Sequence, residues 1–185
     1  MANVLDQSLN PTTNFGFILR YASNNGVKLA QGFTPTISAG VGRIDLKLKK
    51  NGTPTGNIWV TIETDNAGVP SGTSLGQSSN VDVSTLGAEA FVTFSFASPT
   101  SPLTAESPYW IVLQGDYTAS STDDAELRSI ENAVDQYTRG QVSANDGTSW
   151  TNQNGGGNFY DAGFKEYYDD TTIVRSGGSF LLNFI

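Results

Sequence analysis

Hydrophobic and polar residues alternate along residues 28–65, and this alternation predicts β-strands. Ile44, Leu46 and Leu48 occupy every second position of one run, and charged side chains stand between them. Because successive side chains of a strand point to opposite faces, such a run buries one face and exposes the other. Gly, Asn and Pro residues separate this run from two neighbours of similar character. The three predicted strands are 27–34, 42–50 and 56–65.

The rest of the chain continues the β pattern, with turn residues between short apolar runs. Further strands are predicted at 17–22, 90–96, 109–113, 136–143 and 159–168. Asn25-Gly26 is a type I′ turn signal, so 17–22 is expected to pair with 27–34. The run 109–113 is apolar throughout, which predicts a strand buried on both faces. Residues 125–133 fit a helical turn or a strand, and the surrounding β pattern favours a strand.

No long amphipathic helix is evident, and short strands at regular spacing predict an all-β fold. We expect a two-sheet antiparallel β-sandwich, a jelly roll, in which each sheet buries one face. A chain of 185 residues suits one such domain. The predicted organisation is an N-terminal extension and first strand (1–27), the sandwich (28–168) and a C-terminal tail or closing strand (169–185).

Composition excludes several classes of chemistry. The chain has no cysteine and no histidine, so disulfides, thiolate nucleophiles, Ser-His-Asp triads and His/Cys zinc sites cannot be built within it. The net charge is −8. The basic cluster Lys47, Lys49 and Lys50 is interpreted as a solvated strand face protected against edge pairing, so no nucleic-acid partner is expected.

No secretory signal is evident in the sequence. Residues 1–16 lack the basic and apolar regions of a secretory signal, and apolar runs are too short to span a bilayer. We therefore expect synthesis in the cytoplasm and no membrane insertion.

The order of several short segments resembles a known family. These segments are 31–35, 46–50, 52–57, 60–65, 68–72, 91–96, 102–105 and 109–113, followed by 137–150 and 162–165. Together they resemble the carbohydrate-binding-module-like jelly-roll domain of bacterial "choice-of-anchor" surface proteins and tailed-phage virion proteins, over roughly residues 28–168. The resemblance implies a β-sandwich used for recognition, packing or display, and it supplies no catalytic residues.

Carboxylates are the only candidate catalytic groups, and the adjacent pairs among them, Asp123-Asp124 and Asp169-Asp170, stand in polar loops where they are expected to be solvated, so we expect no enzyme. No cofactor is expected, but a structural Ca²⁺ ion is considered, because loop carboxylates are hard oxygen ligands. The candidate ligands are Asp6, Asp65, Asp123, Asp124 and Asp161.

Aromatic residues provide a carbohydrate-binding hypothesis. Trp59 stands on the strand face opposite Ile58, while Trp150 and Tyr160 flank a Gly/Asn-rich loop. Exposed planar rings stack on sugar faces, and neighbouring amides and carboxylates complete the hydrogen bonds. The alternative is that such rings belong to the core or to an interface, as is expected for Trp110 and the aromatic residues of 91–96.

The C-terminal segment 179–185 is strongly apolar. Its large apolar residues are Phe180, Leu181, Leu182, Phe184 and Ile185. Because a free segment of this kind is unfavourable in water, we expect it either to close its own sandwich or to insert into a neighbour as an added strand.

These features favour a non-enzymatic structural virion protein of a tailed phage. We expect a capsid decoration or a tail-associated component, made in the host cytoplasm and assembled through its termini with other virion proteins and copies of itself. The alternative is a carbohydrate-binding module that attaches to surface glycans, located on the extracellular surface.

Overall fold

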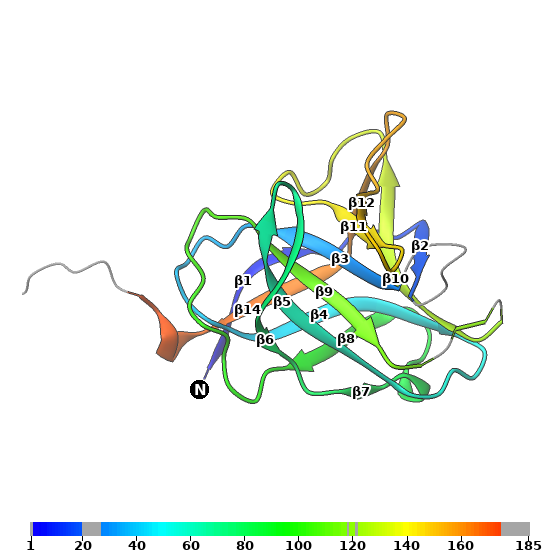
Figure 1. The fold of residues 1–185 in the computed structure, drawn as a ribbon, viewed down its shortest axis with the longest axis horizontal. Helices are drawn as coiled ribbons and strands as arrows, with labels where there is room; N and C mark the ends of the chain where they lie inside the picture. Colours follow the sequence, from blue (N-terminus) through cyan, green and yellow to red (C-terminus); the bar gives the residue numbers. More distant parts are fainter. Residues whose placement is uncertain (1, 20–26, 118, 121, 175–185) are drawn as a thin grey trace, which may run out of the picture.

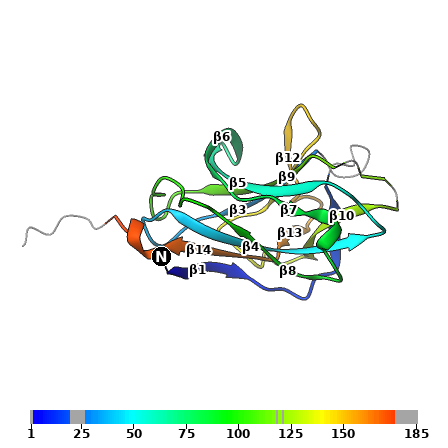
Figure 2. The ribbon, with the colours of Figure 1, turned by 90° about the horizontal axis from the view of Figure 1, so that it is seen from below.

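The computed structural model describes residues 2–19, 27–117, 119–120 and 122–174. Two antiparallel sheets pack face to face, so the predicted β-sandwich is confirmed (Figures 1 and 2). The strands are β1 (Asn3–Leu9), β2 (Phe15–Ile18), β3 (Lys28–Phe33), β4 (Val41–Asn51), β5 (Asn57–Asn66), β6 (Val69–Gln77), β7 (Val81–Asp82), β8 (Ala90–Ser95), β9 (Tyr109–Gly115), β10 (Asp124–Asn132), β11 (Val142–Asn145), β12 (Trp150–Asn152), β13 (Phe159–Ala162) and β14 (Phe164–Asp169). Two short 3₁₀ turns, Val83–Thr85 and Asp170–Thr172, follow β7 and β14.

Each sheet has seven strands within the described residues. The first sheet runs β1-β14-β4-β10-β13, with β2 beside β10 and β8 beside β4. The second sheet runs β12-β11-β3-β9-β5-β6, with β7 beside β5. Most connections therefore cross from one layer to the other. In Figure 2 the two layers are seen edge-on, and β6 and β12 rise from the outer side of the second sheet.

The core lies between the two sheets and is built by the alternation in the sequence. Ile44, Leu46 and Leu48 of the first sheet are buried in it together with Ile58 and Ile62 of the second. Each such side chain contributes about 1.5–3 kcal/mol when it leaves water. The strand β9 is buried on both faces, as predicted, because a second apolar cluster covers its outer side.

The central position of β4 corrects the interpretation of the lysines. β4 pairs with β14, β10 and β8, so it is no edge strand and needs no protection. Instead, Lys47 donates a hydrogen bond to the carbonyl of Pro11 and forms an ion pair with Glu89.

The predicted hairpin between 17–22 and 27–34 is wrong. β2 pairs with β10 in the first sheet, whereas β3 pairs with β9 and β11 in the second. Phe17 of β2 and Leu29 of β3 instead meet in the core between the sheets, because each strand uses its apolar face. The turn residues Asn25 and Gly26 lie outside the described residues.

Three other strand predictions can be compared with the structure. The strand interpretation of 125–133 is confirmed by β10. The strand predicted at 136–143 begins only at Val142, because hydrogen bonds to the side chain of Asp161 and a turn from Tyr137 to Gly140 hold the preceding segment. The strand predicted at 159–168 is divided at Gly163 into β13 and β14.

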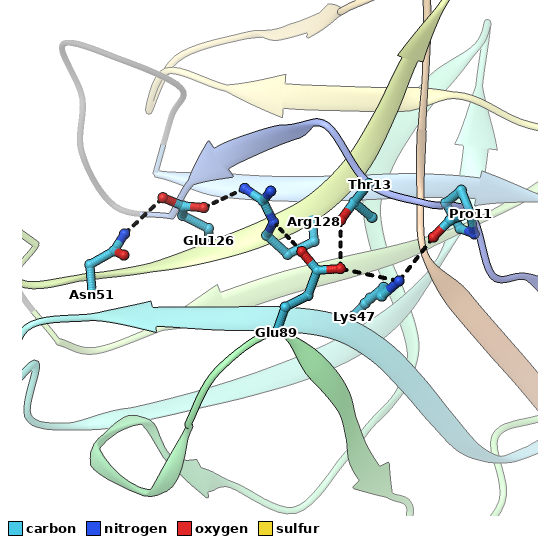
Figure 3. A network of polar contacts seen from close by, with 7 residues as sticks. All are labelled: Pro11, Thr13, Lys47, Asn51, Glu89, Glu126 and Arg128. Atoms are coloured by element: carbon cyan, nitrogen blue, oxygen red, sulfur yellow. Dashed lines mark hydrogen bonds and ion pairs between the residues drawn. The ribbon is translucent and has the colours of Figure 1, made fainter.

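A polar network anchors the N-terminal segment to the first sheet (Figure 3). Glu89 accepts a hydrogen bond from Thr13 and forms ion pairs with Lys47 and Arg128. Arg128 also binds Glu126, which accepts a hydrogen bond from Asn51. The segment between β1 and β2 is therefore held by charges that come from three different strand regions.

The C-terminal segment 179–185, including its predicted assembly residues, lies outside the described residues. Among the described residues, no helix is long and apolar enough to cross a membrane.

Glu89→Gln is expected to destabilise the protein at neutral pH by about 1–2 kcal/mol. Burial opposes ionisation of Glu89, but hydrogen bonds from Thr13, Arg128 and Lys47 outweigh it and lower its pKa to about 2. A depressed carboxyl pKa stabilises the fold above the ordinary value of 4.5, and this contribution is lost as pH falls toward 2. Urea unfolding at pH 7 and pH 3 measures the effect, and an equal loss at both values would contradict it.

Glu166 provides the opposite case. It is 1% exposed, one of its oxygens has no hydrogen-bond partner, and burial, followed by the charge of Asp6, raises its pKa to about 8. The folded state therefore favours the protonated acid, and this stability is lost as pH rises from 4.5 to 8.

Glu166→Gln removes this titration. The wild type loses stability as the pH rises from 5 to 8, whereas the variant does not. The difference in unfolding free energy between variant and wild type is therefore expected to grow by about 3 kcal/mol over this range, because a shift of one pKa unit is worth about 1.4 kcal/mol. Denaturant unfolding at both pH values measures this gain. The exposed carboxyl variant Glu106→Gln is the control, and a gain equal to that of the control would refute the role of Glu166.

Candidate functional site

A pocket of about 440 Å³ opens where one end of the second sheet meets the segment between β10 and β11. This volume falls in the range of small-molecule sites. Its lining residues are Gly32, Phe33, Asp65, Gly68, Pro108, Tyr109, Trp110, Asp135, Thr138, Arg139, Gly140, Gln141, Asn154 and Phe159. The lining therefore combines aromatic rings with carboxylates, amides and a guanidinium group.

The pocket depends on a close approach between two backbones. The N–H of Gly32 in β3 donates to the carbonyl of Gln141 at 2.8 Å. A Cβ atom on Gly140 would lie 1.8 Å from the carbonyl oxygen of Gly32, so no other residue fits there without a shift of the backbone. This contact brings the segment 135–141 onto the end of β3.

The turn between β5 and β6 is anchored to the sheet beneath it. Asp65 accepts a hydrogen bond from the indole N–H of Trp110 at 2.8 Å and another from the N–H of Gly68 at 3.1 Å. Trp110 is 3% exposed, and it belongs to an apolar cluster on the outer face of the second sheet with Ala30 and Val112. The expectation that Trp110 is a core residue is confirmed, and its ring belongs to the apolar cluster on the outer face of the second sheet.

Two amide side chains, those of Asn154 and Gln141, line the pocket near the turn between β5 and β6. Asn154 donates a hydrogen bond to Gln141 at 3.1 Å and accepts one from the N–H of Tyr160. Gln141 in turn donates to the carbonyl of Gly68 at 3.5 Å. Both amides are partly exposed, so they keep hydrogen-bonding capacity for a molecule in the pocket.

Asp161 positions the segment that carries Asp135 and Arg139. Its buried carboxylate accepts hydrogen bonds from the N–H groups of Gln136 and Tyr137, both at 3.1 Å. Burial, followed by the charge of Asp135, raises the pKa of Asp161 to about 7. The side chain of Asp161 thus lies behind the wall of the pocket, and that of Asp135 lies in the wall.

The residues of the predicted aromatic platform lie outside this pocket. None of Trp59, Trp150 and Tyr160 lines the pocket. Trp59 is half-buried on β5, and Trp150 packs against the cluster that contains Trp110. The ring of Tyr160 packs edge-on against Phe15 and Phe17, and its hydroxyl donates to Glu131.

The candidate calcium ligands are dispersed. Among the described residues, no three Asp or Glu side chains gather as a metal site. Each candidate accepts hydrogen bonds from groups of the protein itself. Asp6 binds Thr36, Asp65 binds Trp110, Asp123 binds Thr53, Asp124 binds Asn51, and Asp161 binds Gln136.

The residues that form the pocket were largely missed in the sequence. Asp65 was singled out, but as a calcium ligand, and Arg139 and Gln141 were read as part of a strand. Short-range periodicity carries no signal for a pocket whose walls come from positions 65, 110, 139 and 154. Gly140 is the available clue, because a glycine inside an apparent strand indicates a close backbone approach.

Comparison of the chain with models of known protein families and with curated proteins found no match.

Proposed function

We propose that the protein is a carbohydrate-binding β-sandwich and that the pocket beside Gly32 and Gly140 holds the sugar. The observation that carries this proposal is the combination, in one pocket, of aromatic residues with amide, carboxylate and guanidinium groups. Sugars present an apolar ring face surrounded by hydroxyl groups that both donate and accept hydrogen bonds. A pocket of mixed aromatic and polar lining complements both features.

The arrangement of the polar groups supports binding. Asp65, Gln141 and Asn154 are fixed by hydrogen bonds to other parts of the protein, so little side-chain freedom is lost when a ligand binds. Tyr109 and Phe159 line the same pocket and are partly exposed, which leaves part of each ring for contact with a sugar.

We propose binding without turnover. Glycoside hydrolysis in most enzymes needs two carboxyl groups that act across the scissile bond. In the pocket, Asp65 accepts hydrogen bonds from the indole of Trp110 and the N–H of Gly68, and Asp135 accepts a hydrogen bond from the N–H of Tyr137. Both carboxylates therefore serve the architecture of the pocket.

The binding test uses a glycan array followed by calorimetry of the full chain with each oligosaccharide that binds. Gln141→Ala and Phe159→Ala are expected to weaken binding about tenfold or more, since each removes a contact worth at least about 1 kcal/mol. Trp59→Ala is the matched control, because Trp59 lies on the same sheet outside the pocket lining.

Two results would contradict the proposal. Absence of binding to any glycan would refute the function. Loss of binding in Trp59→Ala alone would move the sugar site from the pocket to the strand face predicted from the sequence.

We also propose a second function, assembly within a virion through the two ends of the chain. Exposed apolar residues at one end favour it: Val4, Leu5, Ile173 and Val174. The backbones of Ala2 and Asp170 are joined by a hydrogen bond, so these exposed residues stand on neighbouring segments. Within the described residues, β1 is the terminal strand of its sheet and pairs with β14 alone. An unpaired strand edge and exposed apolar side chains are features of assembly surfaces.

The assembly test compares the native mass of the full chain with that of a chain ending at Val174. This end point keeps the hydrogen bonds of Thr172 and Val174 to the loop before β4. We expect the full chain to form a defined oligomer and the shortened chain to be a folded monomer. Leu5→Lys should weaken the oligomer, whereas an exposed substitution away from this end, Thr148→Lys, should not. Two monomers of equal stability would refute assembly through the C-terminal segment.

A further inference from the structure

The charges that line the pocket are unbalanced. Asp65 and Asp135 contribute two carboxylates, and Arg139 is the one basic residue among the described residues that line it. Within the described part of the chain, neither carboxylate forms an ion pair. Trp110, Gly68 and Tyr137, which donate hydrogen bonds to them, are neutral groups, so no ion pair offsets their negative charge.

Arg139 is already engaged outside the pocket. Its guanidinium group forms an ion pair with Glu106 at 2.9 Å and donates a second hydrogen bond to the carbonyl of Thr34. Recognition of a carboxylate or phosphate usually relies on an arginine whose donors are free to form two parallel hydrogen bonds. Here Glu106 already holds part of the guanidinium fork and offsets its charge.

The buried carboxyl group of Asp161 responds to the charge of Asp135. It is 2% exposed and stands behind Asp135, and the charge of Asp135 contributes to the rise of its pKa. The negative charge of Asp135 therefore disfavours ionisation of a neighbouring carboxyl group. A carboxylate that entered the pocket would meet the same repulsion, together with that of Asp65.

We propose that the pocket selects uncharged glycans and rejects glycans whose sugars carry a carboxylate. This inference rests on the proposed carbohydrate-binding function and adds the charge class of the ligand. The residues that set the selectivity are Asp65 and Asp135, whose charges face the pocket, and Glu106, which neutralises Arg139. Like charges a few ångströms apart near a protein surface reduce affinity by about tenfold or more.

The test uses matched tetrasaccharides that differ only in the oxidation of C6. The pairs are cellotetraose with its glucuronate counterpart, galactotetraose with tetragalacturonate, and mannotetraose with tetramannuronate. Calorimetry of the full chain at 20 mM salt is expected to show binding of at least one neutral member and about tenfold weaker binding of its acidic partner. At 0.5 M salt the difference between the two affinities should narrow, because the Debye length is shorter and the repulsion between like charges is screened.

Two variants test the named charges. Asp135→Asn keeps an oxygen that can accept the hydrogen bond from Tyr137, and it should bring the affinities for the acidic and neutral members closer by several-fold. Glu106→Gln should improve binding of the acidic member specifically, because it frees the charge of Arg139. Asp146→Asn is the control, since it makes the same change of net charge in an exposed turn outside the pocket.

The outcomes separate the two proposals. If no member of any pair binds, the charge selectivity is overturned, and the glycan array decides separately whether the proposed function stands. If a neutral member and its acidic partner bind equally at low salt, or the acidic member binds more tightly, the selectivity is overturned while carbohydrate binding stands. A response of the control as large as that of Asp135→Asn would also overturn the local role of Asp135.

Discussion

The contact between the backbones of Gly32 and Gly140 is the constraint on which the candidate site depends. Nothing larger than a hydrogen atom fits between the Cα atom of Gly140 and the carbonyl of Gly32. Only this approach allows the N–H of Gly32 to reach the carbonyl of Gln141, which starts the pairing of β11 with β3. The segment 135–141, which connects β10 of the first sheet to β11 of the second, is thereby fixed at the edge of the sandwich, where its side chains form one wall of the pocket.

Buried polar groups complete this arrangement. Gln31 is fully buried in the core, and its side-chain oxygen accepts a hydrogen bond from the N–H of Ala162 in the opposite sheet. Asp161, the residue that precedes Ala162, accepts hydrogen bonds from the N–H groups of Gln136 and Tyr137. Such groups are costly to bury unless they are bonded, so they favour one relative position of the layers over others. The apolar core makes the sandwich stable, and these polar contacts set the geometry of its edge.

The sequence predicted the sandwich because strand periodicity is a local property. The alternation of Ile44, Leu46 and Leu48, and the apolar run 109–113, are enough to identify buried strands. Strand partners are a different matter, since they depend on contacts between distant residues. The Asn25-Gly26 signal favoured a local hairpin, but Phe17 gains more by burial against residues of the opposite sheet.

The candidate site was less predictable for the same reason. Trp59 was expected to expose its ring on the outer face of a strand, and Tyr160 beside a Gly/Asn-rich loop, yet neither position reports whether a ring face is free. In the structure, Phe15 and Phe17 pack edge-on with the ring of Tyr160. The pocket arises instead where turns of both layers converge, and its composition could be read only after the layers were placed.

The two proposed functions place different demands on the same scaffold. A sugar site needs side chains that are fixed before the ligand arrives, and the hydrogen bonds of Asp65, Gln141 and Asn154 provide this. Assembly needs exposed apolar surface, which the structure shows at Val4, Leu5, Ile173 and Val174. These two sets share no residue. A β-sandwich separates such roles readily, because its turns and its edges are built from different parts of each strand. Because the two sets share no residue, each proposed function can be tested by substitutions that do not alter the residues of the other.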